Sequence, residues 1–177
     1  MNTITSGKLM QKAVFLDRDG VINSDEGHYY VYREEDFVLT PQLGEHLKML
    51  QEAGFLLIVV SNQGGVARGL YCIREVERLN NLLRRQMAKH GVQLAEIYIC
   101  PHHPDFGKCL CRKPLPLLVQ KAIARFGIDA SRSYFIGDRK SDMETAHNAG
   151  VKGILSPKNV GIAEAVEEIL RENPAIR

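Results

Sequence analysis

The stretch AVFLDRDG, residues 13–20, decides the fold of this chain. It begins as a continuous apolar run and stops at Asp17, with a second acid, Asp19, two residues later. A short apolar run without polar alternation predicts a strand that is buried on both faces, as in a parallel sheet. Both carboxylates are therefore expected at the carboxyl end of a buried strand.

Four more apolar runs follow the same pattern, each stopping at a polar residue, at 55–62, 96–100, 133–138 and 151–156. Helical periodicity is expected at 40–54, 73–91, 115–127, 141–150 and 162–172, with Thr40 and Ser141 as N-caps and Pro41 in the first turn. This alternation predicts an α/β fold: a doubly wound, mainly parallel sheet with helices on both faces and no large cap domain.

Length and composition are those of one globular domain covering residues 1–177. Hydrophobic residues make up 45% and charged residues 25% of the 177 residues, and the formal net charge is +2. That charge gives no reason to expect nucleic acid or membrane as a partner. We find no apolar segment of signal-peptide or membrane-spanning length, so we expect a cytoplasmic protein. We also expect a monomer, with residues 1–12 flexible.

The polar residues at the strand ends predict a magnesium site. Asp17, Asp19 and Asp138 follow buried strands, and Asp142 lies one helical turn beyond Asp138. A single such acid is more often a turn or capping residue. Carboxyl ends of parallel strands meet at one edge of a sheet, however, and grouped carboxylates repel each other unless a cation or proton intervenes. Oxygen ligands of this kind suit Mg²⁺.

The same group of residues suggests phosphoryl transfer, in which positioning and positive charge supply most of the catalysis. Asp17 could attack phosphorus and form an aspartyl-phosphate, and Asp19 could act as general acid and then general base. The hydroxyl of Ser61 and the ammonium of Lys113 could hold the phosphate oxygens.

Four motifs, "DRDG", "SNQ", "CRKP" and "GDRKSD", in this order and spacing resemble those of the haloacid dehalogenase (HAD) superfamily phosphatases. The resemblance covers roughly residues 13–156. It implies that Asp17 is the nucleophile and Asp19 the acid/base. It also implies that Mg²⁺ is held by Asp17, the backbone carbonyl of Asp19, and Asp138, and that Ser61 and Lys113 stabilise the phosphate.

The segment CPHHPDFGKCLCRKP, residues 100–114, predicts a zinc-binding loop. Cys100 and His102 form one ligand pair, and Cys109 and Cys111 form a second pair with the same one-residue gap. Three cysteines and one histidine make a standard closed, structural zinc site. A disulfide would leave an odd thiol and suits an intracellular chain poorly. Spacing alone leaves His103 open as the fourth ligand, although the matching gaps favour His102.

Within the superfamily, the zinc loop and "SNQGGVARG" resemble the heptose 1,7-bisphosphate phosphatases and the related histidinol phosphatases. The resemblance implies removal of the C7 phosphate from D-glycero-D-manno-heptose 1,7-bisphosphate, in activated-heptose biosynthesis; histidinol phosphate is the alternative substrate. The anomer stays open, because the loop between the ligand pairs is shorter than in some heptose enzymes. The implied substrate contacts are Asp25, Glu26, Gly27, His28, Ser61, Asn62, Gln63, Gly64, Arg112, Lys113 and Arg139.

Two alternatives from other classes are a zinc-stabilised nucleic-acid-binding or end-processing protein and a scaffold without activity. The first needs a basic binding face, which the near-neutral charge does not favour.

The long connection 18–40 is expected to form a flap. Its three tyrosines could close over a sugar or simply secure the flap; they are Tyr29, Tyr30 and Tyr32. Cys72 is expected to be a small filler and His147 a surface or packed residue.

Overall fold

The computed structural model describes residues 10–174, and its centre is a five-stranded parallel sheet in the order β3-β2-β1-β4-β5. The strands are β1 (Lys12–Leu16), β2 (Phe55–Asn62), β3 (Leu94–Cys100), β4 (Tyr134–Gly137) and β5 (Lys152–Leu155). The chain winds outward from β1 to β3, then returns to β4 on the other side. The strand order thus reverses between β1 and β4, where open α/β sheets bind ligands. The predicted doubly wound fold is confirmed.

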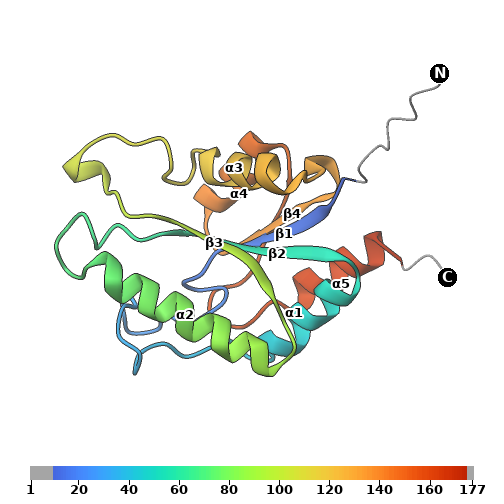
Figure 1. Cartoon of the computed structure of the whole chain (residues 1–177), viewed down its shortest axis with the longest axis horizontal. Coiled ribbons are helices and arrows are strands. Elements are labelled where there is room, and N and C mark those ends of the chain that lie inside the picture. The colour runs from blue at the N-terminus through green and yellow to red at the C-terminus, as the bar shows by residue number, and fades with distance from the viewer. Residues whose placement is uncertain (1–9, 175–177) are drawn as a thin grey trace, which may run out of the picture.

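Five helices cover the two faces of the sheet (Figure 1). One face carries α1 (Leu43–Glu52), α2 (Ile73–Lys89) and α5 (Ala163–Glu172), and the other carries α3 (Leu117–Phe126) and α4 (Lys140–Ala149). Short 3-10 turns lie at η1 (Pro104–Phe106) and η2 (Ala130–Arg132).

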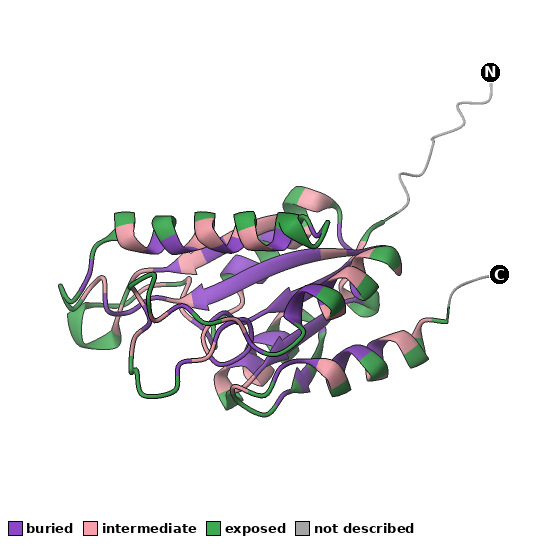
Figure 2. Cartoon of the chain, turned by 90° about the horizontal axis from the view of Figure 1, so that it is seen from below, coloured by how far each residue is buried: buried purple, intermediate pink, exposed green. Residues whose placement is uncertain are grey.

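The alternation of side chains along β1 gives the molecule two apolar cores. Val14 and Leu16 pack beneath α1, α2 and α5, whereas Ala13 and Phe15 pack beneath α3 and α4. Each fully buried large apolar side chain contributes about 1.5–3 kcal/mol. Figure 2 shows the central strands buried between helices whose outer surfaces are exposed. The edge strand β5 is an exception to the predicted double-sided burial, because Ile154 alone of its four residues is buried.

Helix α1 begins later than predicted, because Thr40 is used elsewhere. The Thr40 hydroxyl donates to the carbonyl of Val21 at 2.8 Å, and the residue before the helix is Gln42, in a left-handed conformation. The prediction of Thr40 as N-cap and Pro41 as first helical residue was therefore wrong. The Thr40 side chain instead secures the base of the segment 18–40.

Two further local predictions were wrong. Ser141 does not cap α4; the carboxylate of Asp142 accepts a hydrogen bond from the backbone N–H of Arg139, at 3.1 Å. Cys72 is not a packed filler but an exposed residue that precedes α2. Its backbone N–H donates to the Glu75 carboxylate at 2.7 Å, so the acid three residues later supplies the cap.

The segment 18–40 is secured along much of its length. Val21, Ile22, Val31 and Phe37 are buried in the core beneath α1, α2 and α5. Of the predicted flexible segment 1–12, residues 1–9 lie outside the described part of the chain. Gln11 is paired with the strand-like backbone at Ile128, and β1 begins at the next residue.

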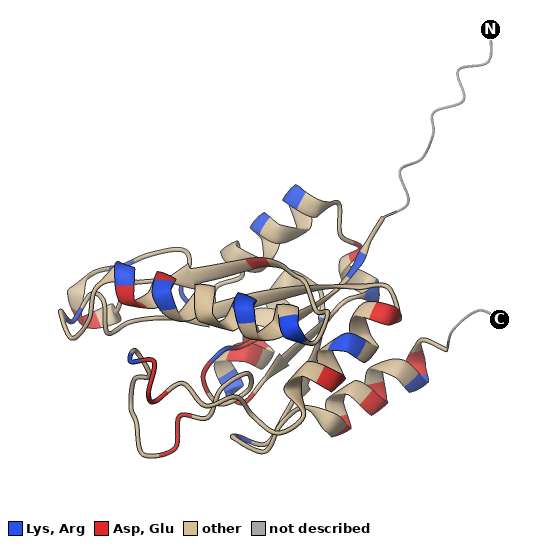
Figure 3. Ribbon diagram, turned by 60° about the horizontal axis from the view of Figure 1, so that its bottom comes forward, with Lys and Arg blue, Asp and Glu red and all other residues tan. Residues whose placement is uncertain are grey.

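Charged side chains of both signs cover the outer surface of the helices. Figure 3 shows Lys and Arg along α2 and acidic residues along α5. Within residues 10–174, every helix is too short or too polar to cross a bilayer.

Candidate active site

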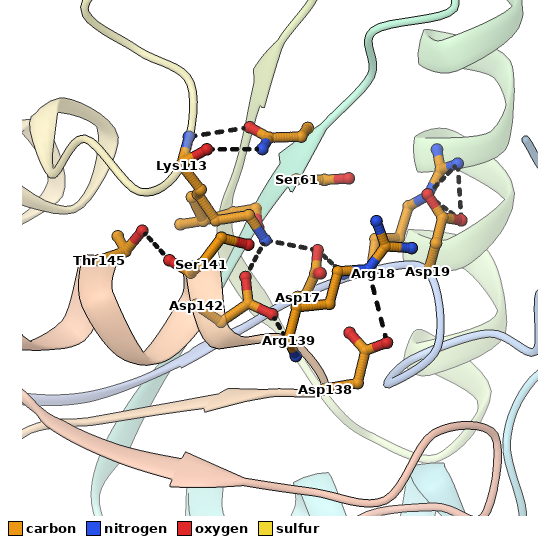
Figure 4. A network of polar contacts seen from close by, with 12 residues as sticks. Asp17, Arg18, Asp19, Ser61, Lys113, Asp138, Arg139, Ser141, Asp142 and Thr145 are labelled. Carbon is orange, nitrogen blue, oxygen red and sulfur yellow. Dashed lines mark hydrogen bonds and ion pairs between the residues drawn. The ribbon is translucent and has the colours of Figure 1, made fainter.

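Three charged side chains from distant parts of the sequence meet at the carboxyl edge of the sheet. The Lys113 ammonium lies 2.7 Å from Asp17 Oδ1 and 2.7 Å from Asp142 Oδ1, and it donates to the carbonyl of Val60 at 3.0 Å (Figure 4). All three side chains are almost completely buried. The ammonium therefore neutralises two carboxylates that would otherwise repel each other without water between them.

Burial and pairing act in opposite directions on this group. Burial raises the pKa of Asp17 to about 7, although the charge of Lys113 opposes the rise. Burial also disfavours the charged form of Lys113, but the carboxylates of Asp17 and Asp142 outweigh it and raise the lysine pKa. Lys113 is thus held as a cation, and a metal ion beside Asp17 would favour its ionised form as well.

The carboxylates of Asp17, Asp138 and Asp142 could hold a metal ion, because one oxygen of each lies within 4.8 Å of the others. Asp138 Oδ1 is buried and has no hydrogen-bond partner among residues 10–174, and burial raises the pKa of Asp138. A buried carboxylate oxygen without a partner is unfavourable unless a cation or proton satisfies it. The donor set therefore fits an oxygen-binding cation such as Mg²⁺.

Gly20 keeps space for this group. Its φ is +91°, and a Cβ there would lie 2.7 Å from Asp138 Oδ2. Any other residue would combine backbone strain with a clash against the candidate metal ligand.

Asp19 lies apart from the other acids in Figure 4, and three side chains donate to it. The Arg18 guanidinium binds it at 3.0 Å, Asn23 Nδ2 at 3.1 Å and Gln63 Nε2 at 2.9 Å. Arg18 itself is fully buried and donates to the carbonyl of Val31 at 2.7 Å. The Asp19 carboxylate is thereby held at a defined place.

A cavity of about 220 Å³ opens onto this network. Eight of its lining residues were predicted from the sequence as site residues: Asp17, Asp19, Asn62, Gly64, Arg112, Lys113, Arg139 and Asp142. Tyr29, Tyr30 and Ser141 line it as well. Carboxylates and the two cations Arg112 and Arg139 line the same cavity. This arrangement suits a metal-bound phosphate ester.

Several other predicted contact residues are not brought to this cavity. Glu26 and His28 line a separate hollow in the segment 18–40, and Gly27 between them is exposed. Asp25 is buried, with Lys158 Nζ 2.8 Å and Arg139 Nη2 3.7 Å from its Oδ2. Its side chain therefore holds the segment against the loop 156–162 and the start of α4.

Ser61 and Gln63 are not among the residues that line the cavity. Both are buried, and Gln63 Nε2 donates to Ser61 Oγ at 2.8 Å. Because Ser61 Oγ accepts that bond, its own hydrogen remains available to another acceptor.

Four side chains in the loop 100–114 meet as a second candidate metal centre. The ligand atoms of Cys100, His102, Cys109 and Cys111 all lie within 4.8 Å of one another. Cys100 Sγ is 3.0 Å from Cys111 Sγ and 3.8 Å from Cys109 Sγ, while His102 Nδ1 is 3.2 Å from Cys111 Sγ. The three cysteines of the cluster, like Cys72 outside it, are free thiols. This donor set and spacing fit tetrahedral Zn²⁺.

The structure separates the two adjacent histidines. His102 points its Nδ1 into the thiol cluster, whereas His103 Nδ1 accepts the Asp105 N–H at 3.3 Å and His103 Nε2 lies 3.2 Å from Arg68. The structure therefore favours His102 over His103, a choice that spacing alone left open and that the matching gaps favoured.

The tyrosines of the segment 18–40 differ in role: some secure the segment against the protein, and others face the cavity. Tyr32 stacks on Tyr71 with ring centroids 5.0 Å apart, and Tyr30 meets the edge of Tyr71 at 5.7 Å. Tyr29 is 83% exposed and lines the cavity with Tyr30. Tyr32 secures the segment, and Tyr29 is the ring available to a ligand. Tyr71 carried no recognisable signal in the sequence.

Comparison with known proteins places these motifs among phosphatases. The family model "HAD-hyrolase-like" (a HAD-like hydrolase) matches residues 110–176. The chain is 42% identical over 148 residues to the D-glycero-beta-D-manno-heptose-1,7-bisphosphate 7-phosphatase of Haemophilus ducreyi, covering 80% of both chains. It is 36% identical over 146 residues to the D-glycero-alpha-D-manno-heptose-1,7-bisphosphate 7-phosphatase of Photorhabdus laumondii, covering 79% of both.

A solved structure supports the same grouping. The D,D-heptose 1,7-bisphosphate phosphatase from B. bronchiseptica, complexed with magnesium and phosphate, superposes with a TM-score of 0.82 at 28% identity. The match covers 92% of this chain and 99% of that one.

Proposed function

The chain belongs to the D-glycero-D-manno-heptose-1,7-bisphosphate 7-phosphatase family of HAD-superfamily phosphatases, and on this premise we propose that it removes the C7 phosphate of that sugar bisphosphate. One observation carries the assignment at this site: Lys113 Nζ lies 2.7 Å from both Asp17 and Asp142, in the wall of a cavity that Arg112 and Arg139 also line. The arrangement combines a nucleophile with fixed positive charge.

Magnesium would be held by Asp17, Asp138 and the backbone carbonyl of Asp19. When bound, Mg²⁺ would neutralise the charge that develops on the transferred phosphoryl group. The unpartnered Asp138 Oδ1 supports this assignment, because a cation would satisfy it.

The chain's own residues then divide the work. Asp17 attacks phosphorus through a carboxylate oxygen and becomes an aspartyl-phosphate, while the C7 oxygen leaves as an alcohol after taking a proton from Asp19. Water, deprotonated by Asp19, then attacks the aspartyl-phosphate and releases inorganic phosphate. Lys113 and the Ser61 hydroxyl offset the negative charge on the phosphoryl oxygens in both steps.

Arg112 is the candidate for the phosphate that the product keeps. It lines the cavity, and one of its guanidinium nitrogens donates to the carbonyl of the zinc-loop residue His102 at 2.9 Å. That bond orients the guanidinium and leaves other N–H groups to bind an anion bidentately.

The second metal is proposed to be structural zinc, held by Cys100, His102, Cys109 and Cys111. Four protein ligands complete a tetrahedral site, so the metal would not bind substrate. Arg112 and Lys113 follow the last ligand directly, so the metal would fix the segment from which both cations project. A cytoplasmic location and a monomeric state stay predictions.

Phosphate release from the α and β heptose bisphosphates and from histidinol phosphate, assayed separately, tests the assignment. We expect turnover of at least one heptose anomer, with the C1 phosphate retained in the product, and no turnover by Asp17→Asn. Faster hydrolysis of histidinol phosphate than of either bisphosphate would overturn the substrate assignment.

A further inference from the structure

A hydrogen-bonded chain behind the active site links a buried phenol to the proposed acid/base. The Tyr71 hydroxyl donates to Gln63 Oε1 at 2.9 Å. At the other end of the same amide, Gln63 Nε2 donates to Asp19 Oδ2 at 2.9 Å and to Ser61 Oγ at 2.8 Å. The two hydrogens of one NH₂ group are thus shared between an acid/base and a phosphate-binding hydroxyl.

The direction of the Gln63 amide matters for both neighbours. If the amide were reversed, its oxygen would face the Asp19 carboxylate, which has no hydrogen to offer when ionised. Ser61 would then donate to that oxygen and lose its free hydrogen. In the present direction, Tyr71 donates its hydrogen to Oε1, and both N–H groups of Gln63 find acceptors in Asp19 and Ser61.

The Tyr71 hydroxyl is suited to act as a fixed donor. The residue is only 5% exposed, and burial raises the pKa of its phenol, so the group keeps its proton. Tyr32 stacks on its ring with an interplanar angle of 10°, and a Cβ on Gly65 would lie 2.1 Å from Tyr71 Cε1. The ring therefore packs between Gly65, where a larger residue would clash with it, and Tyr32 of the segment 18–40.

We infer that Tyr71 is a positioning residue that acts through Gln63 to hold the Asp19 carboxylate and the Ser61 hydroxyl in their working orientations. The inference rests on the proposed function, since it takes Asp19 as the acid/base. It also revises the role of Gln63, which the sequence had placed among the substrate contacts: the polar atoms of its side chain bind protein groups instead.

The test compares kcat and KM of Tyr71→Phe, Gln63→Glu and Gln63→Met with those of the wild-type enzyme. Tyr71→Phe keeps the ring and removes the donor, so kcat should fall about 10-fold, while KM stays within about twofold. Gln63→Glu keeps the shape but has no N–H for Asp19 or Ser61, and should lose at least as much. Tyr32→Phe is the matched control, because it removes a hydroxyl from the stacked ring outside the hydrogen-bonded chain.

The double variant Tyr71→Phe/Gln63→Met separates positioning from general disruption. If Tyr71 acts through Gln63, the double variant should be no slower than Gln63→Met alone. The inference is overturned if the two losses multiply, if Tyr71→Phe keeps the wild-type kcat, or if Tyr32→Phe loses as much as Tyr71→Phe. Should Tyr71→Phe fold poorly, retention of full kcat by Gln63→Glu would overturn it equally.

These outcomes are distinct from failure of the proposed function, in which the wild-type enzyme would not hydrolyse either heptose bisphosphate. The same variants would then be compared on histidinol phosphate, because the role of Asp19 does not depend on which alcohol leaves.

Discussion

The side-chain amide of Asn62 pairs with the backbone of Lys113 as one peptide group pairs with another in a sheet. Asn62 Oδ1 accepts from Lys113 N at 3.1 Å, and Asn62 Nδ2 donates to Lys113 O at 3.2 Å. Asn62 ends β2, and Lys113 lies in the loop 100–114, so this pair ties the backbone that carries Lys113 to the sheet. Asn62 also lines the cavity.

We expect Asn62→Ala to lower kcat by about 10- to 100-fold, because the backbone that carries Lys113 loses its tie and small displacements of catalytic groups are costly. Steady-state phosphate release measures the effect. Asn148→Ala is the matched control, since Asn148 donates to the neighbouring carbonyl of Pro114 from an exposed site at 3.2 Å. Equal losses in both variants would mean that the Lys113 backbone is not specifically held by Asn62.

Replacing Lys113 by Met should lower the free energy of unfolding by about 3 kcal/mol or more at pH 8, because Asp17 and Asp142 would stay buried without a cation. The deficit should shrink toward pH 5. Burial already raises the pKa of Asp17 to about 7, and loss of Lys113 raises it further, so the folded variant takes up a proton that the unfolded chain does not.

Urea unfolding in magnesium-free buffer at the two pH values measures this difference. Lys140→Met, which changes a lysine side chain that is 90% exposed, should stay within about 0.5 kcal/mol of the wild-type protein. A Lys113→Met deficit that is the same at both pH values would contradict the ion-pair explanation.

Cys109→Ala should release the zinc and lower kcat by about 100-fold, because the loop that positions Arg112 and Lys113 loses its fixed point. Zinc content by elemental analysis and phosphate release are measured on the same sample. Cys72→Ala changes an exposed thiol outside the cluster and should keep both zinc and activity. A Cys109→Ala protein that lacks zinc but retains full activity would show that the metal does not position Lys113.

Arg112→Met should raise KM for the heptose bisphosphate by about 10-fold or more, because the charged hydrogen bonds from its guanidinium to the retained phosphate are lost. KM for heptose 7-phosphate, which has no C1 phosphate, should change far less. Arg125→Met removes an exposed arginine that pairs with Glu96 away from the cavity, and it serves as the charge-matched control. A similar rise in KM for both substrates would exclude selective recognition of the C1 phosphate.

The sheet and the acids at its edge could be predicted from the sequence, because buried parallel strands leave continuous apolar runs that end in polar residues. Asp17, Asp138 and Asp142 meet as expected, and the phosphatase family is confirmed. Lys113 joins them from the loop 100–114, a position that was predicted from the motif resemblance and not from periodicity.

Contacts that depend on side-chain direction could not be predicted in the same way. The sequence predicts Thr40 as a helix cap, but in the structure its hydroxyl donates to the carbonyl of Val21. Gln63 lies in the "SNQ" motif, yet its side chain is buried and accepts a hydrogen bond from the Tyr71 hydroxyl. The segment 25–28 was assigned to substrate by resemblance alone, and tertiary packing places Asp25 against Lys158 instead.

The stereochemical course at phosphorus tests the central claim, that Asp17 is a covalent nucleophile, most directly. The substrate is a heptose bisphosphate whose C7 group is a phosphorothioate made chiral by oxygen isotopes. Two successive in-line displacements, first by Asp17 and then by water, predict overall retention of configuration. Inversion would mean that water attacks the sugar phosphate directly, and would contradict the account.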